Sequence, residues 1–256
     1  MQKDKVSIIM PCFNSGKTVI KSVQSVLNQS YQNFELIICD DNSTDNTMTL
    51  LREIKDSRIV ITKNSYRKGA SGARNTALDL CSGYFIAFLD SDDFWHKDKL
   101  MQQITFMKDN TCEFSYSNYY VVKEDRVIGT FYARETIGYN ELLKKCDIGC
   151  LTVIITSRLL GLERFPEGGK EDYRLWLNIL SKDEKMSARN CNAIHAYYSL
   201  SPFSLSGNKL KEVYRQWSVI DDQMISFERK LYCMLIYAVS GLCKHFIKYR
   251  SGKNEI

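Results

Sequence analysis

Three carboxylates stand close together in the stretch FLDSDDFW (88–95), which overlaps the end of the apolar run YFIAFL (84–89). Asp90, Asp92 and Asp93 fall within four positions, so they repel one another unless a cation lies between them. Carboxylates are hard oxygen ligands, and Mg²⁺ or Mn²⁺ commonly combines one or two of them with water and substrate phosphates. The stretch therefore predicts a clamp for a metal-bound diphosphate. The alternative is a solvated acidic turn whose aspartate caps the next helix.

A second acidic pair, Asp40 and Asp41, follows the apolar run FELIIC (34–39). An acidic edge suits a metal-bridged phosphate better than a bare one. It also suits a group that donates hydrogen bonds, such as a ribose hydroxyl or the N–H of a base. Lys68 and Arg74 come later in the chain and are candidates to offset phosphate charge.

The elements that must position these residues alternate through the first hundred residues. Apolar runs predict strands at 6–10, 34–39, 58–62 and 84–89, and periodic patterns predict helices at 19–27, 45–55, 71–80 and 98–108. This alternation favours a parallel sheet covered on both faces, which binds ligands beyond the carboxyl ends of its strands. Four segments are therefore expected to meet at one edge: PCFNSG, DDNSTDN, KNSYRKGASGARN and DSDDFW.

The pattern changes after about residue 110. The later chain predicts a hairpin of 114–122 with 126–131, a short helix at 139–146, a strand at 151–157, a helix opening at EDYRLWL, and an ambiguous strand pair at 188–201. We expect one domain over 1–207, made of two parts (1–110 and 111–207) and followed by a helical tail (208–256).

The tail contains the apolar run LYCMLIYAVSGLC (231–243), followed by KHFIKYR. This run is too short to span a bilayer, but it suits a helix that lies in the interface with basic residues toward lipid head groups. A solvated helix is the alternative. We expect the protein to bind a membrane surface through this basic helix.

Composition narrows the function classes further. The N-terminus has no signal-peptide pattern, so we expect a cytoplasmic protein. Nine cysteines without a CxxC pair, beside only three histidines, favour free thiols and argue against zinc. Nucleic acid is not an expected partner, because the basic residues gather in the tail without a recognisable nucleic-acid module.

In their order and separation these motifs resemble glycosyltransferase family 2. The resemblance rests on VSIIMPCFNSGKTVIKSVQSVLNQSYQNFELIICDDNSTDNT, GASGARNTAL and GYFIAFLDSDD; it is strong over about 5–110 and continues more weakly to about 205. It implies an α/β protein with the GT-A fold, a Rossmann-like and mostly parallel sheet flanked by helices. It also implies an inverting transferase that uses a UDP-sugar donor with Mn²⁺ or Mg²⁺.

The resemblance assigns the nucleotide side residue by residue. Pro11, Phe13 and Asn14 match the first nucleotide-binding segment. Phe13 stands where the family more often has Tyr, so stacking on the base remains while a hydroxyl contact is lost. Asp41 matches the residue that recognises the N–H of uracil.

The resemblance assigns the reacting side in the same way. Asp92 matches the metal ligand, and Asp90 the residue that reaches the ribose or the diphosphate. Asp172, next to Glu171, matches the general base, although a carboxylate at a helix start can also act as a cap. The glycines at 168–169 would allow that loop to move over the substrates.

The implied reaction moves a sugar, best matched by glucose or galactose, to a lipid-linked saccharide acceptor of the undecaprenyl-diphosphate GlcNAc type. The product is a β-linkage, with β-1,3 as the narrower expectation, in O-antigen or other surface-polysaccharide synthesis. The resemblance also implies that 1–110 bind the nucleotide sugar, that 111–207 bind the acceptor, and that the enzyme is peripheral on the inner face of the bacterial inner membrane. A sugar nucleotidyltransferase is one alternative, but PCFNSGKT lacks the glycine-rich phosphate loop that it needs. A non-catalytic nucleotide- or glycan-binding relative is the other alternative, which the joint presence of Asp41, Asp90, Asp92 and Asp172 disfavours.

Overall fold

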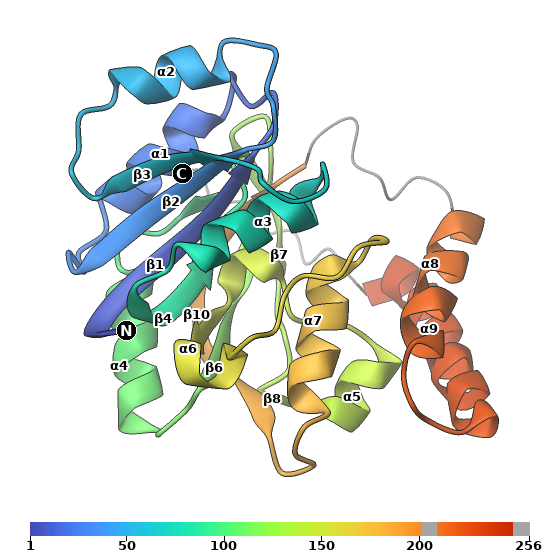
Figure 1. The fold of residues 1–256 in the computed structure, drawn as a ribbon. Coiled ribbons are helices and arrows are strands. Elements are labelled where there is room, and N and C mark those ends of the chain that lie inside the picture. Colours follow the sequence, from blue (N-terminus) through green and yellow to red (C-terminus); the bar gives the residue numbers. More distant parts are fainter. Residues whose placement is uncertain (201–208, 248–256) are drawn as a thin grey trace.

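Within residues 1–200 and 209–247, the part of the chain that the computed structural model describes, ten strands form one mixed sheet (Figure 1). The strands are β1 (Gln2–Cys12), β2 (Phe34–Asp40), β3 (Ile59–Lys63), β4 (Gly83–Phe88), β5 (Phe94–Trp95), β6 (Phe114–Lys123), β7 (Arg126–Phe131), β8 (Thr136–Gly138), β9 (Ile154–Thr156) and β10 (Ser187–Ser199). The helices are α1 (Val19–Leu27), α2 (Thr47–Glu53), α3 (Ala70–Asp79), α4 (Lys99–Asp109), α5 (Tyr139–Lys144), α6 (Ser157–Leu160), α7 (Glu171–Leu180), α8 (Lys209–Asp221) and α9 (Phe227–Ile247), with a 3-10 turn η1 (Cys150–Thr152). The strand order is β3-β2-β1-β4-β9-β6-β10-β5, while β7 pairs with β6 and β8 with β10.

The first four strands confirm the predicted parallel half of the sheet. β1 runs parallel to β2 and β4, and β2 runs parallel to β3. Successive residues of β1 face opposite cores: Ile9 packs with α3 and α7, whereas Ile8 and Met10 pack with α1 and α4. Because helices cover both faces, these strands read as continuous apolar runs.

The second half of the sheet mixes directions. β9 runs antiparallel between β4 and β6, and the predicted hairpin is confirmed as β6 and β7. The predicted strand pair at 188–201 is wrong over the described residues, because 187–199 form the single strand β10. Asn192 adopts a left-handed conformation (φ 57°), and the register with β6 shifts between Asn190 and Ile194. This irregularity interrupts the residue pattern within β10, which in the sequence resembles a turn between two strands.

Two further boundaries differ from prediction. The helix predicted at 45–55 begins only at Thr47, because Asp45 accepts hydrogen bonds from the Thr47 N–H and from the Gly16 N–H and so belongs to the preceding loop. The strand predicted at 151–157 is only β9, since 150–152 form the turn η1.

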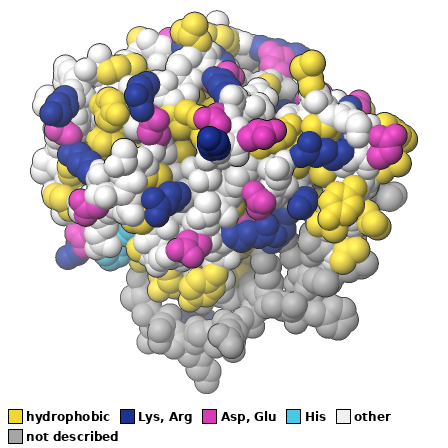
Figure 2. Space-filling model, turned by 90° about the horizontal axis from the view of Figure 1, so that it is seen from below, with side chains coloured by type: hydrophobic (Ala, Val, Ile, Leu, Met, Phe, Trp, Pro, Cys, Tyr) yellow, Lys and Arg dark blue, Asp and Glu magenta, His cyan; other side chains and the backbone are white. Residues whose placement is uncertain are grey.

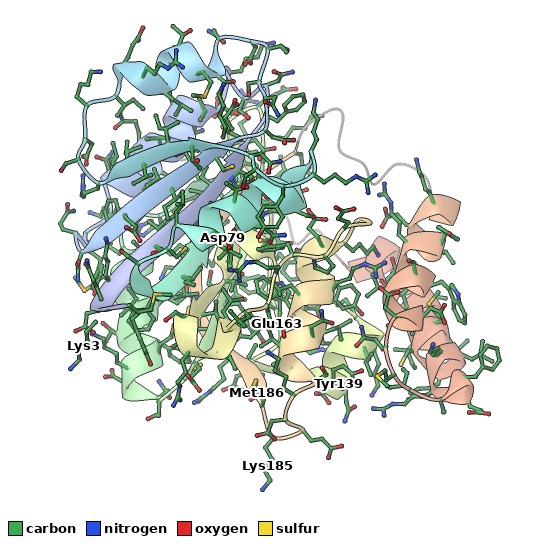
Figure 3. All side chains as sticks on the ribbon, in the orientation of Figure 1. Lys3, Asp79, Tyr139, Glu163, Lys185 and Met186 are labelled. Atoms are coloured by element: carbon green, nitrogen blue, oxygen red, sulfur yellow. The ribbon has the colours of Figure 1, made fainter. Side chains whose placement is uncertain are left out.

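The C-terminal helices α8 and α9 lie beside α5 and α7 at one end of the molecule (Figure 1). Tyr139, labelled in Figure 3 at the start of α5, donates a hydrogen bond to Gln223 at 3.1 Å, and Arg174 of α7 pairs with Asp222. No helix in the described part of the chain is long and apolar enough to cross a membrane. The side chains of KHFIKYR, on which the predicted basic face depends, lie outside the described residues.

The cysteines carry the predicted free thiols wherever their side chains are described. Eight are free, and Cys12, Cys39, Cys112, Cys150 and Cys233 among them are buried. Within the same residues, no group of three or more His, Cys, Asp or Glu side chains could hold a metal by itself.

Candidate active site

The four polar segments that follow the first strands meet at one edge of the sheet, as predicted. The hydroxyls of Ser15 and Ser91 lie 2.7 Å apart, which joins the first segment to the fourth. Asn14 Oδ1 accepts a hydrogen bond from the Thr44 N–H at 2.8 Å and joins the first segment to the second. The third segment joins through Asn64, as described below. Strand polarity places these loops together, because β1 to β4 all end at this edge.

A pocket of about 430 Å³ opens at this edge. Seven of the predicted site residues line it: Pro11, Phe13, Asp41, Lys68, Arg74, Asp90 and Asp92. Asn14 does not line it; its left-handed backbone (φ 48°) and its side chain hold the first two loops together. Asp172 also lies outside the pocket lining and belongs to the start of α7.

The two acids after β2 have different surroundings. Asp40 is buried and its carboxylate accepts the Ser43 N–H at 3.1 Å, so it shapes the loop. Asp41 lines the pocket, where Oδ1 accepts from Asn64 Nδ2 at 2.6 Å and Oδ2 accepts from the Gly69 N–H at 2.8 Å. Each carboxylate oxygen has two lone pairs, so Asp41 keeps acceptor capacity for a ligand N–H after making these bonds.

An aromatic and a cationic side chain lie together at the mouth of the pocket. Phe13 is 45% exposed, and Lys68 Nζ lies 4.6 Å from its ring centroid. This pair offers a stacking surface for a flat base and a mobile cation for a phosphate.

Arg74 is buried and joins two carboxylates from distant parts of the chain. Its Nη2 donates to Asp90 Oδ1 at 2.6 Å and its Nη1 donates to Glu171 Oε1 at 2.9 Å. The guanidinium also lies 5.2 Å from the Phe165 ring centroid. Sequence reasoning treated Arg74 as a cation free to offset phosphate charge, whereas its charge is engaged by the protein. Arg74 therefore links the end of β4 to the start of α7.

The remaining acids of the DSDD segment, Asp92 and Asp93, also have different surroundings: one lines the pocket and the other is buried. Asp93 is buried and accepts the Ser199 N–H at 2.8 Å, so it has a structural role. Asp92 lines the pocket and forms no ion pair with another described residue. The pocket walls, which remove part of its water, and the neighbouring Asp90 both raise the pKa of Asp92. A carboxylate that has lost part of its water and is repelled by a second carboxylate gains free energy when a cation binds to it.

Asp172 lies in the first turn of α7 and is partly buried. Withdrawal from water, together with the charge of Glu171, raises its pKa to about 6, although Arg74 and the Tyr173 N–H oppose the shift. A pKa in this range suits a group that must be ionised near neutrality and still hold a proton when it receives one.

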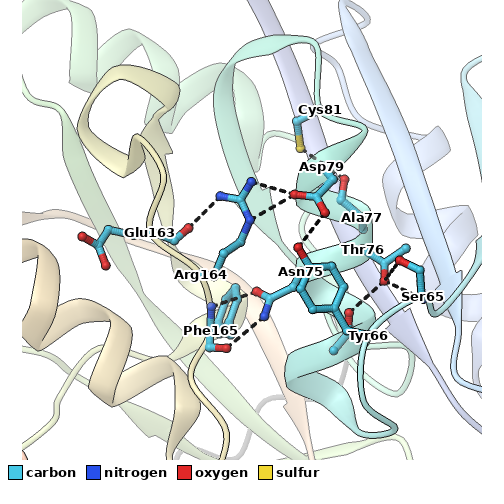
Figure 4. A network of polar contacts seen from close by, with 11 residues as sticks. Ser65, Tyr66, Asn75, Thr76, Ala77, Asp79, Cys81, Glu163, Arg164 and Phe165 are labelled. Atoms are coloured by element: carbon cyan, nitrogen blue, oxygen red, sulfur yellow. Dashed lines mark hydrogen bonds and ion pairs between the residues drawn. The ribbon is translucent and has the colours of Figure 1, made fainter.

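The segment before α7 is fastened along α3, which fixes where Asp172 lies. Arg164 forms a two-point contact with Asp79, and Asn75 exchanges two hydrogen bonds with the backbone of Phe165 (Figure 4). Asp79 and Glu163, labelled in Figure 3, mark these two neighbouring segments. The glycines at 168–169 follow with positive φ angles of 106° and 83°, a backbone conformation that residues with a side chain rarely adopt.

Four further pocket residues belong to the predicted loop segments but were not among the candidate site residues: Cys12, Gly69, Ala70 and Ala73. The last three are small and belong to GASGA, where α3 begins. A run of small residues at the start of a helix, directly after a strand-end loop, was the signal that could have identified them. Burial raises the pKa of the Cys12 thiol to about 12, so this cysteine is an unreactive part of the wall.

Comparison with known proteins places this geometry in a family. The family model described as "Glycosyl transferase family 2" matches residues 7–161, more than half of the chain. This chain belongs to glycosyltransferase family 2. The match covers the four loops, the pocket and the DSDD segment, and it ends before Asp172.

Two curated relatives of this family 2 enzyme come from Escherichia coli. The protein named "UDP-Glc:alpha-D-GlcNAc-diphosphoundecaprenol beta-1,3-glucosyltransferase WfgD" is 50% identical over 248 residues, covering 97% of this chain and 98% of that protein. WfaP, whose name gives the same activity, is 47% identical over 249 residues, with the same coverage of both chains.

Solved structures show the fold. The crystal structure of S. aureus TarS in complex with UDP-GlcNAc aligns with a TM-score of 0.70 at 20% identity, over 91% of this chain and 71% of that chain. The architecture is thus the expected α/β GT-A fold, and the mixed second half of the sheet is part of it.

Proposed function

We propose that this enzyme transfers glucose from UDP-glucose to a GlcNAc-diphosphoundecaprenol acceptor and forms a β-1,3 linkage during surface-polysaccharide synthesis. The observation that carries the proposal is the joint occurrence of the strand-edge pocket with near full-length similarity to two enzymes named for that reaction. The division into a nucleotide-binding half (1–110) and an acceptor half (111–207) belongs to the same proposal.

The pocket holds the nucleotide. Phe13 stacks on the uracil, while Asp41 accepts the hydrogen bond of the uracil N–H, which selects uracil over bases that present acceptors there. Lys68 lies beside Phe13 and contributes positive charge for the diphosphate. Pro11 forms part of the wall next to this pair.

The residues present fit a divalent cation. Asp92 is an oxygen ligand without a protein cation, and Asp90 lies beside it with only its Oδ1 engaged by Arg74. Mn²⁺ or Mg²⁺ would therefore be held by Asp92, with Asp90 assisting and with water and diphosphate oxygens completing the shell. When bound, the ion neutralises the charge that develops on the departing diphosphate.

Asp172 acts as general base. It takes the proton of the acceptor hydroxyl as the oxygen attacks the anomeric carbon of the donor, and UDP leaves as an anion from the opposite face. In-line attack inverts the configuration, so an α-linked donor gives a β-linked product. Arg74 is a positioning residue, because its two ion pairs hold Glu171 beside the base and Asp90 beside the diphosphate.

The C-terminal helices bring the enzyme to its lipid-linked acceptor on the inner face of the membrane. Large apolar side chains of α9 are exposed to solvent: Phe227, Leu231, Tyr232, Leu235 and Val239. In Figure 2 hydrophobic side chains gather at the side where α8 and α9 lie in Figure 1, whereas elsewhere on that face acidic and basic side chains intermingle. An exposed apolar helix face can insert into the head-group layer of a membrane, and this supports a peripheral location.

The proposed function is tested by UDP release from a panel of UDP-sugars with a GlcNAc-diphosphate-alkyl acceptor, in Mn²⁺, Mg²⁺ or EDTA. We expect UDP-glucose to be the preferred donor, metal to be required, and Asp92→Asn to abolish turnover. Asp109→Asn, at the exposed end of α4, is the matched control. Turnover that persists in EDTA refutes the metal, and the absence of UDP release from every donor refutes the transferase.

A further inference from the structure

The structure has a second cavity, of about 290 Å³. Its walls come from β6, β7, the segment between α5 and η1, and the end of β10. We refer to it as the aromatic cavity, because Tyr119, Phe131 and Tyr198 form much of its lining. It shares no lining residue with the nucleotide pocket.

The aromatic rings are held in a fixed arrangement. Tyr119 and Phe131 stack with centroids 4.8 Å apart and planes at 14°, and Tyr198 meets Tyr119 edge-on at 6.0 Å. Burial raises the pKa of Tyr119, so its hydroxyl stays protonated and can donate a hydrogen bond. Rigid rings with polar tips bind the mixed apolar and hydroxylated surface of a sugar.

A buried carboxylate lines the same cavity. Asp147 is only 5% exposed. Two cations pair with its carboxylate, because Lys145 Nζ lies 2.6 Å from Oδ1 and Arg134 Nε lies 3.7 Å from Oδ2. Each carboxylate oxygen has two lone pairs, so the paired Asp147 can still accept a hydrogen bond from a ligand hydroxyl or amide N–H.

The aromatic cavity adjoins the reacting groups. Asp93 fixes the Ser199 N–H, and Ser199 directly follows Tyr198 on β10. Burial, followed by the charges of Asp93 and its acidic neighbours, raises the pKa of Tyr198. A ligand in the cavity therefore lies near the DSDD segment, and it shares no wall residue with the nucleotide pocket.

We propose that the aromatic cavity binds the acceptor's terminal N-acetylhexosamine ring, with Asp147 accepting a hydrogen bond from a hydroxyl or the acetamido N–H. This inference rests on the proposed function. The volume lies near the lower end of small-molecule sites, which span about 300–1,000 Å³, so it suits one ring rather than a longer glycan. The carboxylate and the apolar Val121, Ile148 and Leu200 disfavour a diphosphate inside, so the diphosphate and lipid extend outward.

Two variants test the site by different means. Asp147→Asn keeps the volume and replaces an acceptor oxygen by an amide, whereas Val121→Phe fills the cavity from β6. Asp109→Asn and Ile128→Phe, an exposed position on the same hairpin outside the cavity lining, are their controls. Calorimetric binding of a GlcNAc-diphosphate-alkyl probe is expected to weaken at least about tenfold in both variants, because a lost hydrogen bond to a charged group is worth about 1.5–3 kcal/mol. UDP affinity is expected to stay within about twofold, which also shows that the variants are folded.

The outcomes separate the cavity from the proposed function. Unchanged probe affinity in both variants, with normal turnover by the wild type, refutes the acceptor site and leaves the transferase intact. A rise in the KM for UDP-glucose, with the acceptor KM unchanged, shows that the cavity holds the donor sugar and also refutes the proposal. If the wild type releases no UDP with any acceptor, the proposed function fails, while the probe-binding comparison still decides the cavity.

Discussion

Replacing Asp172 by Asn is expected to remove activity and stabilise the fold together. The amide keeps the size of the side chain and can accept the Tyr173 N–H through its oxygen. It cannot take a proton from the acceptor, and loss of a general base costs about 10²- to 10⁴-fold in rate. In the wild type, kcat is expected to fall as the pH drops through about 6, where Asp172 becomes protonated.

The stability gain follows from the raised pKa. Folding moves the pKa of Asp172 up from 3.8 to about 6, so the protonated form favours the fold and the ionised form opposes it. The cost of the ionised form is fully present above pH 6 and disappears below pH 4. About two pKa units at about 1.4 kcal/mol each give a ceiling of about 3 kcal/mol at pH 8, and about half of that at pH 5.

Partial contact with water reduces this ceiling, and we expect a gain of about 1–2 kcal/mol at pH 8, or a rise of about 3–6 °C in Tm. Urea unfolding at pH 8 and pH 5, with Asp109→Asn as control, measures the gain and its pH dependence. An Asp172→Asn variant that is no more stable than the wild type at pH 8 refutes the raised pKa. One that keeps kcat within tenfold of the wild type refutes the assignment of Asp172 as base.

The other predictions concern the nucleotide pocket. Arg74→Lys keeps one positive charge but cannot donate to Asp90 and Glu171 in the same planar geometry, so kcat is expected to fall at least about tenfold. The control Arg58→Lys, at a surface ion pair, is expected to leave kcat unchanged. Steady-state kinetics measure both values, and equal kcat values for the two variants contradict the positioning role. Asp41→Asn removes the charge of the acceptor and, in one orientation of the amide, turns its NH2 group toward the uracil N–H. The Kd for UDP is therefore expected to rise about 10- to 100-fold. Calorimetry with UDP and with CDP measures that rise, and an undiminished preference for UDP over CDP would rule out uracil recognition by Asp41.

Much of the nucleotide half could be predicted because its signals are local. β1 to β4 appear as apolar runs, and the order of parallel strands places their C-terminal loops at one edge, so Asp41, Asp90 and Asp92 were expected to approach one another. Prediction was weaker where a local irregularity resembles a boundary. At Asn192 a left-handed residue shifts the register within β10, and periodicity alone cannot distinguish this from the end of a strand.

The chemistry of single positions was less accessible. Nothing near Arg74 in the chain indicates that its charge is taken up by Glu171, because the partners are 97 residues apart and meet only when α7 docks against α3. The pKa of Asp172 likewise depends on the water that packing excludes, which no spacing of residues reports.

Residue types and their order along the chain thus determined the family, the parallel half of the sheet and the set of acids at its edge. Propensity and hydrophobic periodicity act over a few residues and leave a readable pattern. Tertiary structure alone decided which acids are engaged and which are free, and it alone formed the aromatic cavity, where Tyr119, Asp147 and Tyr198 meet from three separate segments. Burial and contact between distant segments are set by the packing of the whole chain, and they decide the charge and the reach of each side chain.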